Sequence, residues 1–201
     1  GLGILLDVGA NVECRATHLL QFAAMGSEYA KVSLGIGRPR VGLLSIGEEE
    51  SKGTDLVRDA HQLLKSAPIR FVGNVEARDL YTGQADVIVC DGFTGNVALK
   101  VSEGLVDTVE TLLSEELSGT FSGMVGSLLS RRAFRRFRRR VDYSEYGGAP
   151  LLGVARLCIL GHGRSSPKAV RNAVAMAYRF AAHRLIERVE QDMDAAAVLH
   201  R

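Results

Sequence analysis

The sequence predicts an α/β protein with a mainly parallel sheet. Short apolar runs alternate along its 201 residues with longer segments whose apolar residues recur at a helical period. Strands that alternate with helices favour parallel pairing through right-handed crossovers. With 46% apolar and 24% charged residues and a formal net charge of +2, the composition is that of a folded domain and excludes a disordered, collagen-like or coiled-coil chain.

The expected elements follow from these runs in chain order. Apolar runs bounded by glycine or polar residues predict strands at residues 4–8, 41–46, 69–72, 86–90 and 155–160. Segments with one apolar side predict helices at residues 12–30, 54–65, 96–117 and 167–189. We expect a single domain over residues 1–201, without internal repeats or a long linker.

Features that the sequence lacks narrow the class of protein. No apolar stretch is long enough for a transmembrane helix, and no secretory signal opens the chain. The first residue is Gly1 rather than Met, which suggests a fragment or a processed chain. The three cysteines, Cys14, Cys90 and Cys158, are far apart and favour a reducing, cytoplasmic compartment. Buried, inert thiols are the favoured interpretation, and a nucleophilic Cys90 is the alternative. No nucleotide-binding motif or paired histidine spacing is present, so we expect neither a cofactor nor a metal.

Glycine lies beside a polar or ionisable residue after each of the five predicted strands. These loops cover residues 7–11, 45–54, 73–76, 91–96 and 161–167. Ligands of open parallel sheets bind at the carboxyl ends of the strands, and glycine lets the backbone approach them closely. We therefore expect a ligand site on one edge of the sheet; the alternative is a set of ordinary capped strand–helix turns.

The strongest anion site that the sequence predicts lies at residues 161–167. Ser166 is placed to cap the following helix, and Pro167 fits its first position. Free backbone amides and the helix dipole then favour phosphate, with His162 as a further donor. The expected phosphate ligands of this loop are Gly163, Arg164, Ser165 and Ser166. The alternative interpretation is a well-capped helix with His162 merely packed.

A second group of candidates follows the fourth predicted strand. Asp91 ends that strand, Thr94 can cap the next helix, and Asn96 can hold a carbonyl or phosphate oxygen, with Lys100 one turn further on. For Asp91 the alternative is a turn-forming aspartate. Further substrate-binding candidates in other loops are Asp7, Asn11 and Lys52, the last of which also fits a flexible solvated loop.

Residues 119–140 depart from the alternating pattern. Glycines interrupt an apolar segment that contains Phe121, Met124, Val125, Leu128 and Leu129. Seven arginines then occur within residues 131–140, and the membrane or partner candidates among them are Arg131, Arg132, Arg135 and Arg136. Arginines next to apolar residues suit an anionic membrane surface, and a solvated charged face is the alternative. One short basic run is not a nucleic-acid recognition fold, so we expect no nucleic-acid partner.

Four uninterrupted blocks resemble phosphate acyltransferases of the PlsX type. They are LLDVGAN at residues 5–11, FVGNVE at 71–76, VCDGFTGNV at 89–97 and YGGAPLLG at 146–153. The resemblance implies transfer of a fatty acyl group from acyl-carrier protein to inorganic phosphate, and a three-layer α/β/α fold like that of isocitrate and isopropylmalate dehydrogenases. It also implies a homodimer attached peripherally to the cytoplasmic membrane through a protruding helical hairpin, expected at residues 118–140. The glycine- and aspartate-rich N-terminal portion of the family is missing here.

For this reaction, our own hypothesis assigns roles to the residues of the predicted loops. Residues 163–166 would hold phosphate, with Arg164 or Lys100 neutralising its charge. Asn96 or His162 would donate to the oxyanion, and Asp91 would orient His162 or accept a phosphate proton. Two other classes stay open: a decarboxylating dehydrogenase of the same fold, and a non-catalytic membrane or nucleic-acid adaptor that uses residues 131–140.

Overall fold

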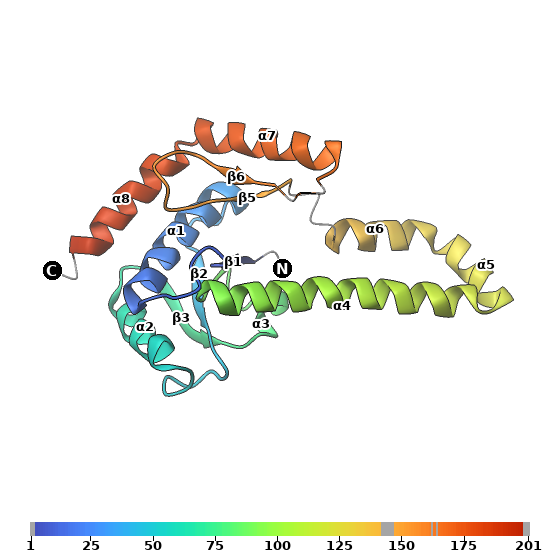
Figure 1. The fold of residues 1–201 in the computed structure, drawn as a ribbon, viewed down its shortest axis with the longest axis horizontal. Helices are drawn as coiled ribbons and strands as arrows, with labels where there is room; N and C mark the ends of the chain where they lie inside the picture. Colours follow the sequence, from blue (N-terminus) through green and yellow to red (C-terminus); the bar gives the residue numbers. More distant parts are fainter. Residues whose placement is uncertain (1–2, 142–146, 162, 164, 199–201) are drawn as a thin grey trace. The chain divides into compact units, whose positions relative to one another are not determined.

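The computed structural model describes residues 3–141, 147–161, 163 and 165–198 (Figure 1). The fold is mixed α/β with a mainly parallel sheet, as predicted. Backbone contacts divide the chain into two compact units. Unit 1 comprises Gly1–Ala98, Leu152–Leu157 and Arg179–Arg201, and unit 2 comprises Leu99–Leu151 and Cys158–Tyr178.

Unit 1 is built on a four-stranded sheet whose strands are all parallel. Its order is β1 (Ile4–Leu6), β4 (Val87–Val89), β2 (Arg40–Leu44) and β3 (Arg70–Val75). The first four predicted strands are thereby confirmed. Residues of β4 are buried throughout, because this inner strand is packed on both faces.

Helices α1 (Ala16–Leu34), α2 (Asp55–Ser66) and α8 (Leu185–Val198) belong to the same unit, together with the short α3 (Asp79–Thr82). Gly26 brings α1 onto the sheet, since a Cβ at this position would lie 2.6 Å from Cγ1 of Val87. α8 packs along α1, where Arg188 donates to the buried carboxylate of Glu28 at 3.0 Å.

The side of the sheet that carries Leu44 and Ile88 has its own apolar cluster. Its members are Leu44, Val75, Ala85, Ile88 and Cys90, with Leu5 and Leu80 packed against them. This burial fixes the strand ends, and therefore fixes where the loops after β1, β2, β3 and β4 emerge. Because the strands are parallel, those four loops leave the same edge of the sheet.

Unit 2 contains most of α4 (Gly92–Ser118), then α5 (Phe121–Leu129) and α6 (Arg131–Val141). Thr120 caps α5, accepting a hydrogen bond from the backbone N–H of Gly123 at 3.0 Å. A two-stranded antiparallel sheet of β5 (Ala149–Pro150) and β6 (Ile159–Leu160) follows, and then α7 (Pro167–Ala182), which stays in unit 2 as far as Tyr178.

Two predicted elements were wrong. Residues 155–160 do not form a fifth parallel strand, because only Ile159–Leu160 is a strand and it pairs antiparallel with Ala149–Pro150. The long helix at residues 167–189 is instead two helices. Arg184 adopts φ 52°, a left-handed conformation that no helix continues through, so α7 ends before it and α8 begins after it.

The helices of unit 2 expose large apolar side chains. They include Val101, Leu105, Val109 and Leu112 on α4, Phe121, Leu128 and Leu129 on α5, and Val170, Val174 and Tyr178 on α7. The periodic apolar sides that the sequence indicated therefore exist but are not covered by the residues that the structure describes. In the described residues no helix is both long and apolar enough to cross a membrane.

Candidate active site

The loop after β1 is organised around the carboxylate of Asp7. Its Oδ1 accepts the backbone N–H groups of Gly9 at 2.9 Å and Ala10 at 2.8 Å. Its Oδ2 accepts the backbone N–H and the side-chain amide of Asn11, both at 2.8 Å. Four donors on one buried carboxylate hold residues 7–11 in a single conformation.

These donors also set the ionisation of Asp7. Burial alone would raise the pKa of its carboxyl group, but the hydrogen bonds from Ala10, Asn11 and Gly9 together outweigh burial and lower the pKa below its ordinary value. Asp7 is therefore a fixed anion that shapes the loop. Because all four donors point at it, this carboxylate is a structural acceptor rather than a free proton carrier.

The first turn of α4 packs directly on this loop. Gly92 donates its backbone N–H to the carbonyl of Asn11 at 2.8 Å, and a Cβ at position 92 would lie 2.7 Å from that oxygen. A Cβ at Gly95 would lie 1.8 Å from the carbonyl oxygen of Asp7. Only glycine fits either position without displacing the backbone.

Asn96 lies where these two segments meet. Its side-chain nitrogen is 3.3 Å from the position that a Cβ on Gly9 would occupy. Gly9 itself has φ 133°, a conformation that favours glycine. The Asn96 side chain is exposed, so the site presents one amide donor to solvent beside a rigid loop.

Asp91 caps the start of α4. Its carboxylate accepts the backbone N–H of Thr94 at 2.8 Å and the Thr94 hydroxyl at 2.7 Å. The sequence prediction assigned the cap to Thr94, but Asp91 is the capping residue and Thr94 is its donor. The helix accordingly begins at Gly92, four residues before the predicted start.

A buried polar network fastens the loop after β2, which carries Lys52. The side-chain nitrogen of Asn74 donates to the carbonyl of Glu49 at 2.8 Å, and its oxygen lies 2.9 Å from Nδ1 of His61. Asn74 is only 3% exposed. Nε2 of His61 lies 3.5 Å from the carboxylate of Glu50, which also pairs with Lys65.

The orientation of the Asn74 amide gives Nδ1 of His61 the role of hydrogen-bond donor. The Asn74 amide donates to Glu49, so its oxygen is the atom that faces the imidazole and accepts from Nδ1. Both residues were missed as positioning groups from sequence. Asn74, a polar residue just after the apolar run of the third predicted strand, was the signal that could have found them.

The predicted phosphate loop belongs to unit 2. Ser166 caps α7 as predicted, because its Oγ accepts the backbone N–H of Ala169 at 3.2 Å. That amide is therefore not free for a ligand. Gly163 has open space around it, whereas His162 and Arg164 lie outside the described residues.

Lys100 also belongs to unit 2. Its ammonium pairs with Glu103 at 2.8 Å. Of the predicted site residues, the structure brings together Asp7, Asn11, Asp91, Thr94 and Asn96 within unit 1. Lys52 lies in the neighbouring loop of the same edge, with its side chain exposed. The described residues contain no cluster of metal-ligating side chains.

The predicted membrane residues lie on α5 and α6. Phe121 is 80% exposed and Leu129 is 81% exposed, and Val125, Leu128, Arg131, Arg132 and Arg136 are exposed as well. The side chains of Met124 and Arg135 lie outside the described part of the chain.

The fold and the site define an α/β protein whose parallel sheet carries glycine-containing loops at its carboxyl edge. The chain belongs to the fatty acid synthesis protein family, whose model matches residues 1–188. The resemblance to phosphate acyltransferases of the PlsX type is thereby confirmed.

Several curated relatives are named phosphate acyltransferase. The protein from Acidobacterium capsulatum is 54% identical over 200 residues, which cover 100% of this chain and 59% of that relative. The protein from Nitratidesulfovibrio vulgaris is 54% identical over 199 residues, 98% of this chain and 58% of the relative. The protein from Koribacter versatilis is 55% identical over 199 residues, 96% of this chain and 55% of the relative. This chain thus spans somewhat more than half the length of these relatives.

Proposed function

We propose that this chain is part of an acyltransferase that moves a fatty acyl group from acyl-carrier protein to inorganic phosphate. A phosphate oxygen attacks the thioester carbonyl, the carbon–oxygen bond forms, and the carbon–sulfur bond breaks. The products are an acyl phosphate and the thiol of the carrier protein, which takes up the proton. The names of the relatives and the family match support this reaction.

The observation that carries the proposal is the interlock between residues 7–11 and the first turn of α4. It holds Asn96 beside Gly9 with its side chain exposed, which supports Asn96 as the donor to the developing oxyanion. Removing one such donor from an acyl-transfer site costs about 3–4 kcal/mol of transition-state stabilisation. Thiolate is a good leaving group and phosphate is already nucleophilic, so positioning supplies much of the remaining rate.

The other residues take supporting roles. Both carboxylate oxygens of Asp91 accept hydrogen bonds from Thr94. This arrangement favours a role in fixing the start of α4 over a role in proton transfer. In unit 2, the backbone of residues 163–166 and the charge of Arg164 or Lys100 are assigned to phosphate. His162 is the alternative oxyanion donor. Lys52, Asn11 and Thr94 line the substrate edge of unit 1.

The test uses the full-length protein with acyl-carrier protein as acyl donor and labelled phosphate. The expected result is label in an acyl phosphate together with release of the free carrier thiol, both dependent on phosphate. Acyl transfer to water instead of phosphate, or no turnover, would overturn the proposal. Near-normal rates in both His162→Ala and Asn96→Ala, with folding intact, would remove these two residues from the mechanism.

The family resemblance extends to assembly. We assign this chain to a homodimer with a fold like isocitrate and isopropylmalate dehydrogenases, held on an anionic membrane surface by a helical hairpin of residues 118–140. Exposed Phe121 and Leu129 next to exposed Arg131 and Arg132 support the membrane contact, since apolar groups insert and arginines meet lipid phosphates. Acidic acyl-carrier protein is the competing partner for these arginines.

A further inference from the structure

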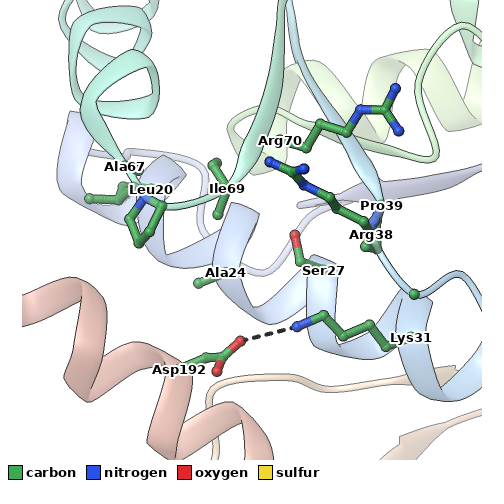
Figure 2. Close-up of a pocket in the computed structure, with 12 residues that line it drawn as sticks. Leu20, Ala24, Ser27, Lys31, Arg38, Pro39, Ala67, Ile69, Arg70 and Asp192 are labelled. Atoms are coloured by element: carbon green, nitrogen blue, oxygen red, sulfur yellow. Dashed lines mark ion pairs between the residues drawn. The ribbon is translucent and has the colours of Figure 1, made fainter.

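A pocket of about 360 Å³ lies in unit 1, away from the loops of the candidate active site (Figure 2). Its residues come from α1, from the segments that lead into β2 and β3, and from α8. Arg38 and Pro39 directly precede β2, and Arg70 is the first residue of β3. The pocket therefore lies at the edge where the parallel strands begin, whereas the candidate active site lies where they end. Its volume is within the range of small-molecule sites, about 300–1,000 Å³.

Positive charge dominates the lining. Three cations, Lys31, Arg38 and Arg70, face one carboxylate, that of Asp192. The charge of Lys31 is already balanced by two carboxylates, because its ammonium pairs with Glu28 and lies 3.6 Å from Asp192 (Figure 2). Burial and a hydrogen bond with Glu28 raise the pKa of Asp192 above its ordinary value.

The other two cations are Arg38 and Arg70, of which Arg70 interacts electrostatically with the carboxylate of Asp86. Within the part of the chain that the structure describes, neither Arg38 nor Arg70 makes an ion pair. The nearby carboxylate of Asp86 is already taken by Arg40, at 2.8 Å. Figure 2 shows the Arg38 and Arg70 side chains along the same side of the pocket. Both residues belong to the lining, and the Arg70 guanidinium lies further from the apolar residues of the pocket than the Arg38 guanidinium does.

The rest of the wall is apolar. Leu20 and Ala24 of α1 are buried and form one side, and Ile69 faces them from the segment before β3. An apolar wall beside two guanidinium groups is suited to an amphipathic molecule, because neither a purely polar nor a purely apolar ligand satisfies both parts.

We propose that this pocket binds a small molecule in which a phosphate monoester is joined to a short apolar body. The planar guanidinium groups of Arg38 and Arg70 bind phosphate oxygens through paired hydrogen bonds, and their two charges match a phosphate dianion better than a carboxylate. Leu20, Ala24 and Ile69 contact the apolar body. This second site is separate from the proposed acyl transfer and does not depend on it.

The test is a titration of the full chain, labelled at the isoleucine methyl groups, followed by NMR. Ile69 reports on this pocket, and Ile46, which is exposed just after β2, reports on the opposite edge. We expect hexyl phosphate to shift the Ile69 resonance saturably, hexanoate to do so at least tenfold more weakly, and hexanol not at all. A shift confined to Ile46, or none at Ile69, would overturn the proposal.

Two sets of variants test separately the contacts to the phosphate and the contacts to the apolar body of the ligand. The Arg38→Ala/Arg70→Ala double variant should weaken hexyl phosphate binding at least tenfold; Arg171→Ala, an exposed arginine of α7, is the matched control. Ala67→Leu narrows the pocket without removing charge, so it should weaken hexyl phosphate but not inorganic phosphate. Equal affinity for hexyl phosphate and inorganic phosphate in the unmodified chain would contradict the role of the apolar wall. Unchanged affinity in the double variant would contradict the role of the arginines.

Discussion

The α-carbon of Gly95 lies so close to the main chain of Asp7 that a Cβ at position 95 would be 1.8 Å from the Asp7 carbonyl oxygen. This contact joins the exit of β1 to the first turn of α4. Real Cβ atoms do not approach backbone oxygen so closely, so any larger residue at position 95 must displace one segment or the other. The geometry around Asn96 therefore depends on a residue without a side chain.

Gly95→Ala should destabilise the protein by at least about 2 kcal/mol, because the new methyl group overlaps a rigid backbone. Gly104→Ala is the matched control on the same helix, where a Cβ meets nothing within 4 Å. This control should be neutral or stabilising by about 0.5–1 kcal/mol, because alanine is the better helix former. Denaturant unfolding of both variants measures the difference, and equal stabilities would contradict the interlock.

Asp7→Asn should remove an acid-sensitive part of the stability. The folded-state pKa of Asp7 is below its unfolded value of about 3.9, so its contribution is fully present above that value and is lost as the pH falls through the folded pKa. Unfolding free energies measured from about pH 6 to pH 2 should therefore fall less steeply in Asp7→Asn. Asp59→Asn, an exposed aspartate on α2, should keep the wild-type slope, and identical slopes in all three proteins would refute the assignment.

Asn74→Ala should loosen the loop that carries Lys52. The change leaves His61 and the carbonyl of Glu49 without their buried partner, at a cost of about 1–3 kcal/mol. Hydrogen exchange should accelerate in residues 47–53 but not in β4. Gln62→Ala, exposed next to His61 on α2, is the control. Unchanged exchange in residues 47–53 would show that the network does not hold the loop.

Cys90 should resist alkylation while Cys158 reacts. Burial, with the nearby carboxylates of Asp91 and Asp7, raises the pKa of the Cys90 thiol to about 12, so almost no thiolate exists at neutral pH. Cys158 is exposed. Mass spectrometry after iodoacetamide treatment of the folded protein at pH 7.5 compares the two. Modification of Cys90 at the rate of Cys158 would contradict the buried environment.

Replacing Phe121 and Leu129 together by serine should abolish flotation with vesicles of anionic lipid, because these two exposed residues supply the apolar part of the contact. Val170→Ser, which alters an exposed apolar residue of α7, should leave flotation unchanged. If the unmodified protein binds neither anionic nor neutral vesicles, the membrane proposal fails, and the arginines of α6 either meet the carrier protein or form a solvated charged face.

Periodicity in the sequence predicted β1 to β4 and the body of α1, α2 and α4, because each carries a regular apolar pattern, although the apolar side of α4 is exposed. It missed the first turn of α4, where Gly92 and Gly95 look like loop residues. Their role is a tertiary contact with Asn11 and Asp7, which no local pattern encodes. The break at Arg184 was also missed, since arginine is a good helix former and its left-handed conformation has no signal in the local sequence.

The candidate site likewise has features that the sequence predicted and features that only the fold shows. Glycine next to polar residues after the strands predicted the loops of Asp7 and Asp91, because turn chemistry is local. The sequence did not reveal that Thr94 donates hydrogen bonds to the Asp91 carboxylate, or that His61 supports a loop through Asn74. These side-chain hydrogen bonds depend on the fold. The pocket of Arg38 and Arg70 is invisible in sequence, where these arginines are more than 30 residues apart.

The steady-state rate of phosphate-dependent acyl phosphate formation by Asn96→Ala, in the full-length protein, tests the central claim most directly. The account predicts that kcat falls about 100-fold or more while the unfolding free energy stays within about 1 kcal/mol of wild type, because an exposed oxyanion donor is lost without a buried contact. A kcat within twofold of wild type would contradict it.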